Sequence, residues 1–333
     1  MRHVLRPIVL ALAVLLVQSA PGAAAVRVVA TTEHLAAIAR IVGGNRIVVD
    51  FMVKGSRDPH AADPRPSLST LLNRADLLIV NGQGLEAAWL PSVIASSTNN
   101  RTRESKPGQL DASVGASLLP YDPKELDAPF LVKALVAVAG LVAGRREEFQ
   151  LGQNHHYWLD PANGAAIARA IADRLALLDP SNAEFYRSNH ATFAARLKVK
   201  LDDWDQQMKP FAGMEIVSYH RSWTYLAARH GLKTAAYVEP REPLLLAPTK
   251  LSIAPDAEDV TALIAGMAQR RVRVLVAETY QDRDLLQDIA ARSGAHLALL
   301  PSSVSASEGL PDYFALFDKI YEQLTAALTR SRS

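Results

Sequence analysis

Runs of β-branched residues and helical segments alternate along this chain in two series, and one long helical segment separates the series. In the separating segment, 181–208, apolar residues recur three, four or seven positions apart, which is the spacing of one face of a helix. At about 1.5 Å per residue this helix would be roughly 40 Å long, more than one lobe of this size needs. We therefore expect it to join two lobes. Asp179-Pro180 before it, and Ser181 with Glu184 three positions later, predict a capped start.

Both series predict parallel sheets. The expected strands are 26–31, 46–53 and 76–81 in the first series, and 214–219, 234–238, 272–277 and 296–300 in the second. Strands that alternate with helices are typical of parallel sheets covered by helices. The predicted fold class is α/β, with an N-terminal lobe over 26–180, a linking helix over 181–209 and a C-terminal lobe over 210–333. The least regular part is 96–153, where one helix is expected at 131–143.

The first 25 residues have the pattern of a signal peptide. Arg2 and Arg6 precede an apolar run at 8–17, and residues 23–25 form an A-x-A cleavage site. The run is too short to anchor the chain in a bilayer. We therefore expect cleavage before Val26 and export to a bacterial periplasm as a soluble protein.

The composition narrows the kinds of site and partner. The 333 residues contain no cysteine, so we expect no disulfide, no thiolate metal ligand and no lipid-carrying cysteine after the leader. The 36 basic and 34 acidic residues nearly balance, and the basic residues are scattered along the chain. That distribution argues against nucleic acid as a partner. We expect a monomer.

Three histidines occur where predicted elements end. His60 follows the second strand, His156 precedes a helix that Asp160-Pro161 begins, and His220 ends the strand 214–219. Ligands of open parallel sheets bind at the carboxyl ends of the strands. Neutral imidazole is a good zinc ligand, and three such donors still need a fourth group or a water to complete a tetrahedron. Together the three histidines predict a metal held between the lobes, with Asp58 placed to orient His60.

Five separated parts of the sequence also resemble one family. They are DPHAADPRPS at 58–67, ADLLIVNGQGLEAAWLP at 75–91, HYWLDP at 156–161, SYHRSWTYLAARHGL at 218–232 with YVEPRE at 237–242, and AETYQDR at 277–283. These segments are similar, in the same order, to the zinc and manganese solute-binding receptors of bacterial ABC transporters. The resemblance implies two βα lobes joined by one long helix, a metal in the cleft with ligands at His60, His156 and His220, and delivery of that metal to a membrane permease.

The resemblance also bears on the metal and on its fourth ligand. Manganese receptors tend to have a carboxylate where this chain has His220, which favours Zn²⁺ over Mn²⁺. Many members place an aspartate before the last helix, but the matching segment 301–307, which includes Ser302 and Ser303, contains no carboxylate. We predict Glu278 as the fourth ligand, because it follows a strand and would offset the charge of the metal. Glu239 and a water are the alternatives, and Glu278 could instead only cap the next helix.

The other histidines are expected to be structural. His155 adjoins His156, and neighbouring side chains point in different directions, so the H-x-W spacing selects His156 as the ligand. Four further histidines lie in predicted helices or strands: His34, His190, His230 and His296.

Three other interpretations were weighed. The sequence G-x-G-x-x-A at 82–87 matches a dinucleotide fingerprint, but it follows the third strand and lacks the acidic residue of a βαβ unit, so it predicts a tight turn. A zinc hydrolase would need an open metal position and a base such as Glu278, yet no H-E-x-x-H or G-x-S-x-G motif occurs. Nothing beyond an exported location supports an adhesin. We expect no enzyme, and a manganese or iron receptor of the same fold is the alternative function.

Overall fold

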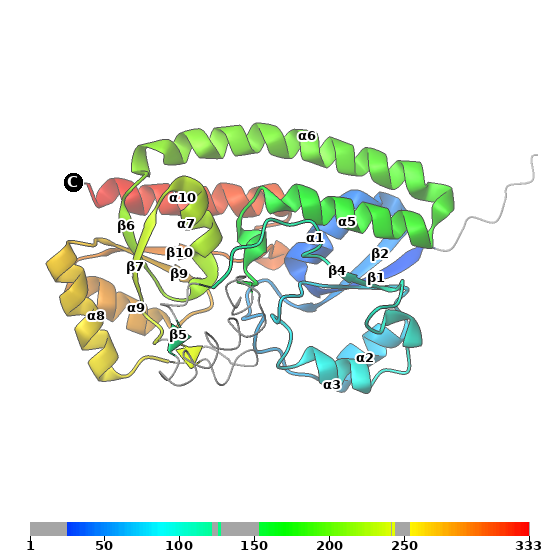
Figure 1. The fold of residues 1–333 in the computed structure, drawn as a ribbon, viewed down its shortest axis with the longest axis horizontal. Coiled ribbons are helices and arrows are strands. Elements are labelled where there is room, and N and C mark those ends of the chain that lie inside the picture. Colours follow the sequence, from blue (N-terminus) through cyan, green and yellow to red (C-terminus); the bar gives the residue numbers. More distant parts are fainter. Residues whose placement is uncertain (1–24, 122–125, 128–152, 241, 244–253, 333) are drawn as a thin grey trace, which may run out of the picture.

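Two α/β lobes lie side by side beneath one long helix (Figure 1). The computed structural model describes residues 25–121, 126–127, 153–240, 242–243 and 254–332. The leader residues 1–24 and the helix expected at 131–143 lie outside this range. The predicted fold class is confirmed, whereas the lobe boundaries at 180 and 209 stay predictions.

The N-terminal lobe is built on a parallel sheet in the order β2-β1-β3-β4. Residues on the two faces of β1 alternate between two cores: Val28 and Ala30 pack with α1 and α5, and Val29 packs with α2 and α3. Strand β4 was not predicted, because its three residues lie in the irregular part of the sequence. The elements of this lobe are β1 (Val26–Thr32), α1 (Glu33–Gly43), β2 (Ile47–Val53), α2 (Pro66–Asn73), β3 (Leu77–Val80), α3 (Leu90–Ala95), β4 (Gln109–Asp111) and α5 (Asn163–Leu178).

The C-terminal lobe repeats this plan with a parallel sheet in the order β10-β9-β6-β7. Helix α8 has the bounds 257–270, and strand β10 the bounds 296–300, that the sequence predicts, and the other elements differ from the prediction by a few residues. The elements are β6 (Glu215–Ser218), α7 (Thr224–His230), β7 (Lys233–Tyr237), α8 (Ala257–Arg270), β9 (Val274–Glu278), α9 (Arg283–Ser293), β10 (His296–Leu300) and α10 (Tyr313–Arg330). A separate pair of two-residue strands, β5 (Leu126–Asp127) and β8 (Glu242–Pro243), is also parallel.

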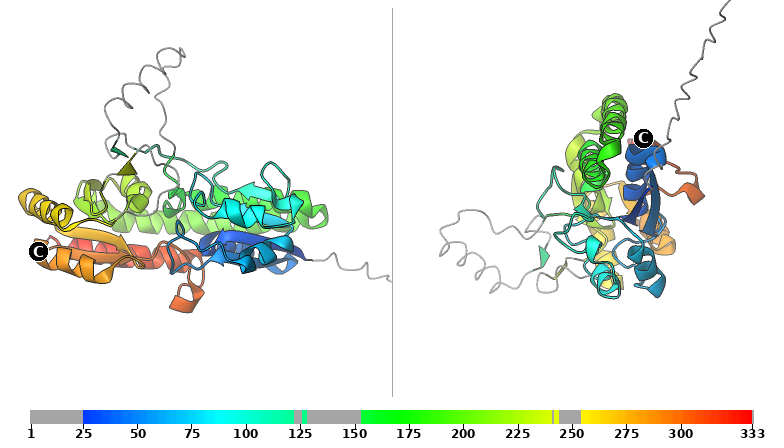
Figure 2. Two further views of the ribbon diagram at one scale, coloured as in Figure 1. Left: turned by 90° about the horizontal axis from the view of Figure 1, so that it is seen from below. Right: turned by 90° about the vertical axis from the view of Figure 1, so that its right-hand side faces the viewer.

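The long helix is α6 (Ala183–Met208), and it packs on α1, α5 and α10 (Figures 1 and 2). Its buried side chains are those of the predicted apolar stripe: Tyr186, Phe193, Leu197, Trp204 and Met208. The predicted capping box is wrong. A 3-10 turn over Pro180–Asn182 precedes the helix, and the side chain of Asp179 accepts hydrogen bonds within this turn and from the hydroxyl of Tyr186.

The lobes share one hydrophobic core. A single cluster of buried residues includes Val28 of β1, Phe193 of α6 and Val276 of β9. Polar contacts cross the same boundary: the Trp158 indole donates to the carbonyl oxygen of Ser302 at 2.8 Å, and the Tyr313 hydroxyl donates to that of Pro161 at 2.9 Å. The two lobes are therefore packed directly against each other, in addition to being joined by α6.

Within the parts of the chain that the structure describes, no helix has both the length and the apolar character needed to cross a membrane.

Candidate metal site

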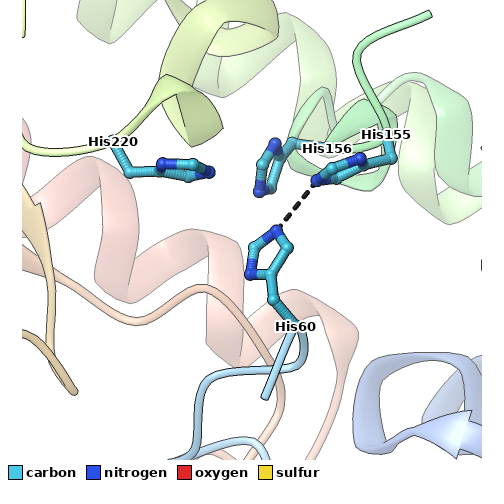
Figure 3. A group of neighbouring side chains, drawn as sticks. All are labelled: His60, His155, His156 and His220. Carbon is cyan, nitrogen blue, oxygen red and sulfur yellow. Dashed lines mark hydrogen bonds between the residues drawn. The ribbon is translucent and has the colours of Figure 1, made fainter. Parts of the chain in front are cut away.

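Four histidine side chains meet between the lobes (Figure 3). They are His60 in the loop after β2, His155 and His156 in a turn before the 3-10 helix Tyr157–Leu159, and His220 just after β6. One ring nitrogen of each lies within 4.8 Å of those of the other three. The structure thus brings the three predicted histidines together and adds His155, which sequence reasoning had set aside.

The outer nitrogen of each ring has a hydrogen-bond partner. Asn154 provides one of these partners and also donates from its Nδ2 to the carbonyl oxygen of Arg221 at 3.0 Å, so it connects His156 to the segment that carries His220. Because each Nδ1 is engaged in this way, the Nε2 atoms face one another. The Nδ1 partners are Asp58 Oδ1 for His60 at 2.6 Å, Asn154 Oδ1 for His156 at 3.0 Å, the Tyr121 hydroxyl for His155 at 3.2 Å, and Glu239 Oε2 for His220.

One inward nitrogen has no protein partner in the described part of the chain, and two others face each other. His156 Nε2 is fully buried and has no hydrogen-bond partner among the described residues. His60 Nε2 and His155 Nε2 lie 2.8 Å apart, so one ring nitrogen faces another. A buried polar atom without a partner costs about 1–3 kcal/mol. Such a costly arrangement of converging nitrogen atoms fits a divalent transition metal ion as the missing partner.

The protonation states suit metal binding. Burial, and then the neighbouring histidines, hold the pKa values of His155 and His156 well below the usual histidine range. Both rings are therefore neutral at pH 7, which is the form that binds a metal. Burial acts to raise the pKa of Asp58, but the hydrogen bond to His60 and the charge of that ring outweigh it, and the pKa is lowered. Asp58 thus keeps its negative charge beside His60.

A tight turn after β3 helps to position the tandem histidines. Gly82, Gln83 and Gly84 all have positive φ values, of 78°, 53° and 86°. The predicted turn is confirmed. It leaves the Asn81 side chain donating to the carbonyl oxygen of His155 at 2.9 Å.

Neither predicted carboxylate belongs to the group of four nitrogens. Glu278 ends β9 and is fully buried, and burial raises its pKa despite the opposing influence of His220 and Ser222. Its assignment as a metal ligand stays a prediction. Glu239, the alternative, is hydrogen bonded to His220 Nδ1.

The segment 301–307 faces the N-terminal lobe. The Ser303 hydroxyl accepts from the backbone N–H of His34 at 3.2 Å, and the carbonyl oxygen of Ser302 accepts from Trp158. The His34 ring is buried and stacks on Trp158 with 4.7 Å between the ring centroids. Its packing agrees with the structural role expected for His34.

The sequence was compared with known families. The model described as "Zinc-uptake complex component A periplasmic" (ZnuA) matches residues 28–327. The chain belongs to this family. The resemblance inferred from the five sequence segments is thereby confirmed.

One curated relative and two solved structures that resemble the chain are named with different metals. The chain is 26% identical over 218 residues to the manganese ABC transporter substrate-binding lipoprotein PsaA of Streptococcus mitis, a match that covers 63% of this chain and 60% of that protein. A deletion mutant of ZnuA with zinc bound superposes with a TM-score of 0.68 at 23% identity, covering 91% of this chain and 98% of the other. FpvC of Pseudomonas aeruginosa in complex with Mn²⁺ gives 0.70 at 20% identity, covering 92% and 99%. At these identities the two structures show the shared fold.

Proposed function

We propose that this protein is a periplasmic receptor that binds one zinc ion between its lobes and delivers it to the permease of an ABC transporter. The observation that carries the proposal is the convergence of His60, His156 and His220, each with its Nε2 turned inward and its Nδ1 held by an acceptor. Membership of the ZnuA family supports the transport role.

The chemistry of the donors favours zinc over manganese. Imidazole nitrogen suits zinc, copper, nickel and iron, whereas manganese prefers carboxylate, carbonyl and water oxygens. Every member of the converging group is a histidine. A manganese or iron receptor remains the alternative, since the names of the relatives include manganese.

The charge of the ion is offset by carboxylates that need not touch it. Neutral imidazoles leave a divalent ion with its full charge in a partly buried site, which is costly without nearby negative charge. Asp58 and Glu239 each accept a hydrogen bond from a ring of the cluster. Such partners also fix the ring orientation, and removing one lowers metal affinity about 10–100-fold in other proteins. A carboxylate that acts through a histidine ring is thus an alternative source of the negative charge for which Glu278 was predicted as a ligand.

The proposal is tested with the protein purified without chelator. We expect one zinc ion per chain, and at free zinc 100 times the dissociation constant the ion should raise the unfolding free energy by about 2.7 kcal/mol. Combined replacement of His60, His156 and His220 by alanine should abolish both effects, while His190→Ala, on α6 and outside the cluster, should keep them. Unchanged zinc stoichiometry in the triple variant would refute the site.

We expect a receptor that delivers zinc to a permease to catalyse no reaction of its own, and transport and catalysis are measured separately. We expect the wild-type protein, and not the triple variant, to restore zinc uptake to cells that lack it. Steady hydrolysis of esters, phosphates or peptides that disappears in His220→Ala would instead favour a zinc hydrolase.

A further inference from the structure

The four outer partners of the histidine cluster share one property, because each can accept a hydrogen bond. The carboxylates of Asp58 and Glu239 accept and cannot donate. The Asn154 amide donates from its Nδ2 to the carbonyl oxygen of Arg221, so its Oδ1 is the atom that meets His156. The Tyr121 hydroxyl, which meets His155 Nδ1, can also accept.

An imidazole that donates from Nδ1 to such a partner offers the lone pair of its Nε2 to a metal. His155 has the same arrangement as the three predicted histidines: its Nδ1 meets an outer partner, and its Nε2 lies 2.8 Å from His60 Nε2.

We infer that His155 is the fourth ligand of the metal. The inference rests on the proposed metal site.

The geometry of the turn makes this ligand available. Neighbouring side chains diverge in helices and strands, but His155 and His156 lie in a turn, and their ring centroids are 4.3 Å apart. Asn81 holds the backbone of His155 from the N-terminal lobe. In a tetrahedral zinc site with bonds of about 2.0–2.1 Å, the nitrogens are about 3.4 Å apart. The four nitrogens, all within 4.8 Å of one another, already approach that spacing.

A fourth imidazole has consequences for the metal. It closes the tetrahedron with protein nitrogens, and a zinc site closed in this way leaves no position for the water that a hydrolase activates. It also keeps oxygen donors away from the ion, which disfavours manganese. His155 would therefore determine specificity as well as affinity.

Affinity measurements test the ligand assignment. His155→Ala should weaken zinc binding at least about tenfold, and His155→Phe, which keeps the ring without its nitrogens, should do the same if the loss is chemical and not a packing defect. With Co²⁺ as the probe, the strong visible absorption of a four-coordinate ion should fall in both variants, because water replaces the nitrogen. Replacing His155 by aspartate should lower the ratio of zinc to manganese affinity by at least about tenfold.

Nitrogen-15 NMR of the zinc-loaded protein tests which ring nitrogen binds the ion. We expect His155, like the other three rings, to carry its proton on Nδ1 and to bind zinc through Nε2. Tyr121→Phe should weaken zinc binding while the cobalt spectrum stays four-coordinate, because Tyr121 positions the ligand and does not bind the ion. His190→Ala is the control for removing a histidine outside the cluster.

The outcomes separate this inference from the proposed function. A wild-type protein that binds no zinc would refute the site itself. If the wild type binds zinc, then unchanged affinity and cobalt spectrum in both His155 variants would overturn the ligand assignment, above all if Glu278→Gln loses affinity instead. A His155 ring that keeps its proton on Nε2 in the zinc-loaded protein would also overturn it.

Discussion

Asn154 connects His156 to the segment that carries His220. Its removal should have two separately measurable effects, one on the unfolding free energy and one on zinc affinity. Its Oδ1 accepts from the backbone N–H and from Nδ1 of His156 at 2.9 and 3.0 Å, and its Nδ2 donates to the carbonyl oxygen of Arg221 at 3.0 Å. The side chain is 1% exposed, so water does not readily replace it. Asn154→Ala therefore leaves the backbone N–H and Nδ1 of the buried His156 without this acceptor, whereas the carbonyl oxygen of Arg221 still accepts from the Thr224 hydroxyl at 2.9 Å.

The expected magnitudes follow from these contacts. The backbone N–H of His156 loses its acceptor, which should cost about 1–3 kcal/mol of the unfolding free energy of the metal-free protein. The His156 ring also loses its orientation, which should lower zinc affinity about 10–100-fold, equivalent to about 1.4–2.7 kcal/mol. Urea unfolding measures the first effect, and competition with a chromogenic zinc chelator measures the second.

Asn163 offers a matched control for Asn154. It is also buried, at 4% exposed, and its side chain makes three hydrogen bonds, to the backbone of Ser117 and Tyr157 and to no histidine. Asn163→Ala should destabilise the protein to a similar extent and leave zinc affinity within about threefold of the wild type. If the two variants lose stability but have equal zinc affinity, then Asn154 does not position His156 and the argument fails.

Two further predictions concern stability. Gly164 of α5 has no room for a Cβ, which would lie 2.3 Å from the Tyr313 hydroxyl, so Gly164→Ala should lower the unfolding free energy by about 1–3 kcal/mol. Gly266→Ala in α8 meets open space and should raise the unfolding free energy by about 0.5–1 kcal/mol. Equal changes in melting temperature for the two variants would contradict this. Burial lowers the pKa of His34 to about 3 and that of His230 to about 4, so the unfolded chain binds protons below pH 6.5 that the folded chain does not. The unfolding free energy should fall on acidification by up to about 1.4 kcal/mol per pH unit for each histidine, down to these values, and His34→Gln should make the slope shallower; an unchanged slope would show that His34 does not contribute.

The sequence carried most of the information about the fold because the signals were local. Periodicity located α8 and β10, and five of the six residues in the predicted apolar stripe of α6 are buried, while Leu201 is partly buried. The start of α6 was harder to predict, since Ser181 and Glu184 had the spacing of a capping box but the chain forms a 3-10 turn there. Spacing alone does not determine which of two local hydrogen-bond patterns a helix start adopts.

The candidate site could be predicted only in part. His60, His156 and His220 were identified because the carboxyl ends of parallel strands, and the loops beside them, converge in this architecture. His155 was set aside by a rule about neighbouring side chains that holds in regular elements and not in the turn where it lies. Asn154 and Tyr121 gave no sequence signal, because their roles depend on contacts between segments far apart in the chain. The assignment of Glu278 as a ligand stays a prediction.

The shared core has a consequence for the order of folding. Helix α10, the last helix of the chain, packs against α1 and α6, and Tyr313 and Phe314 contact the Phe193 ring at centroid distances of 5.5 and 5.4 Å. The N-terminal lobe therefore cannot complete its packing until the C-terminal residues have been synthesised. A first half that stays incompletely packed until the last helix is made suits the export that we propose, because it remains easier to unfold.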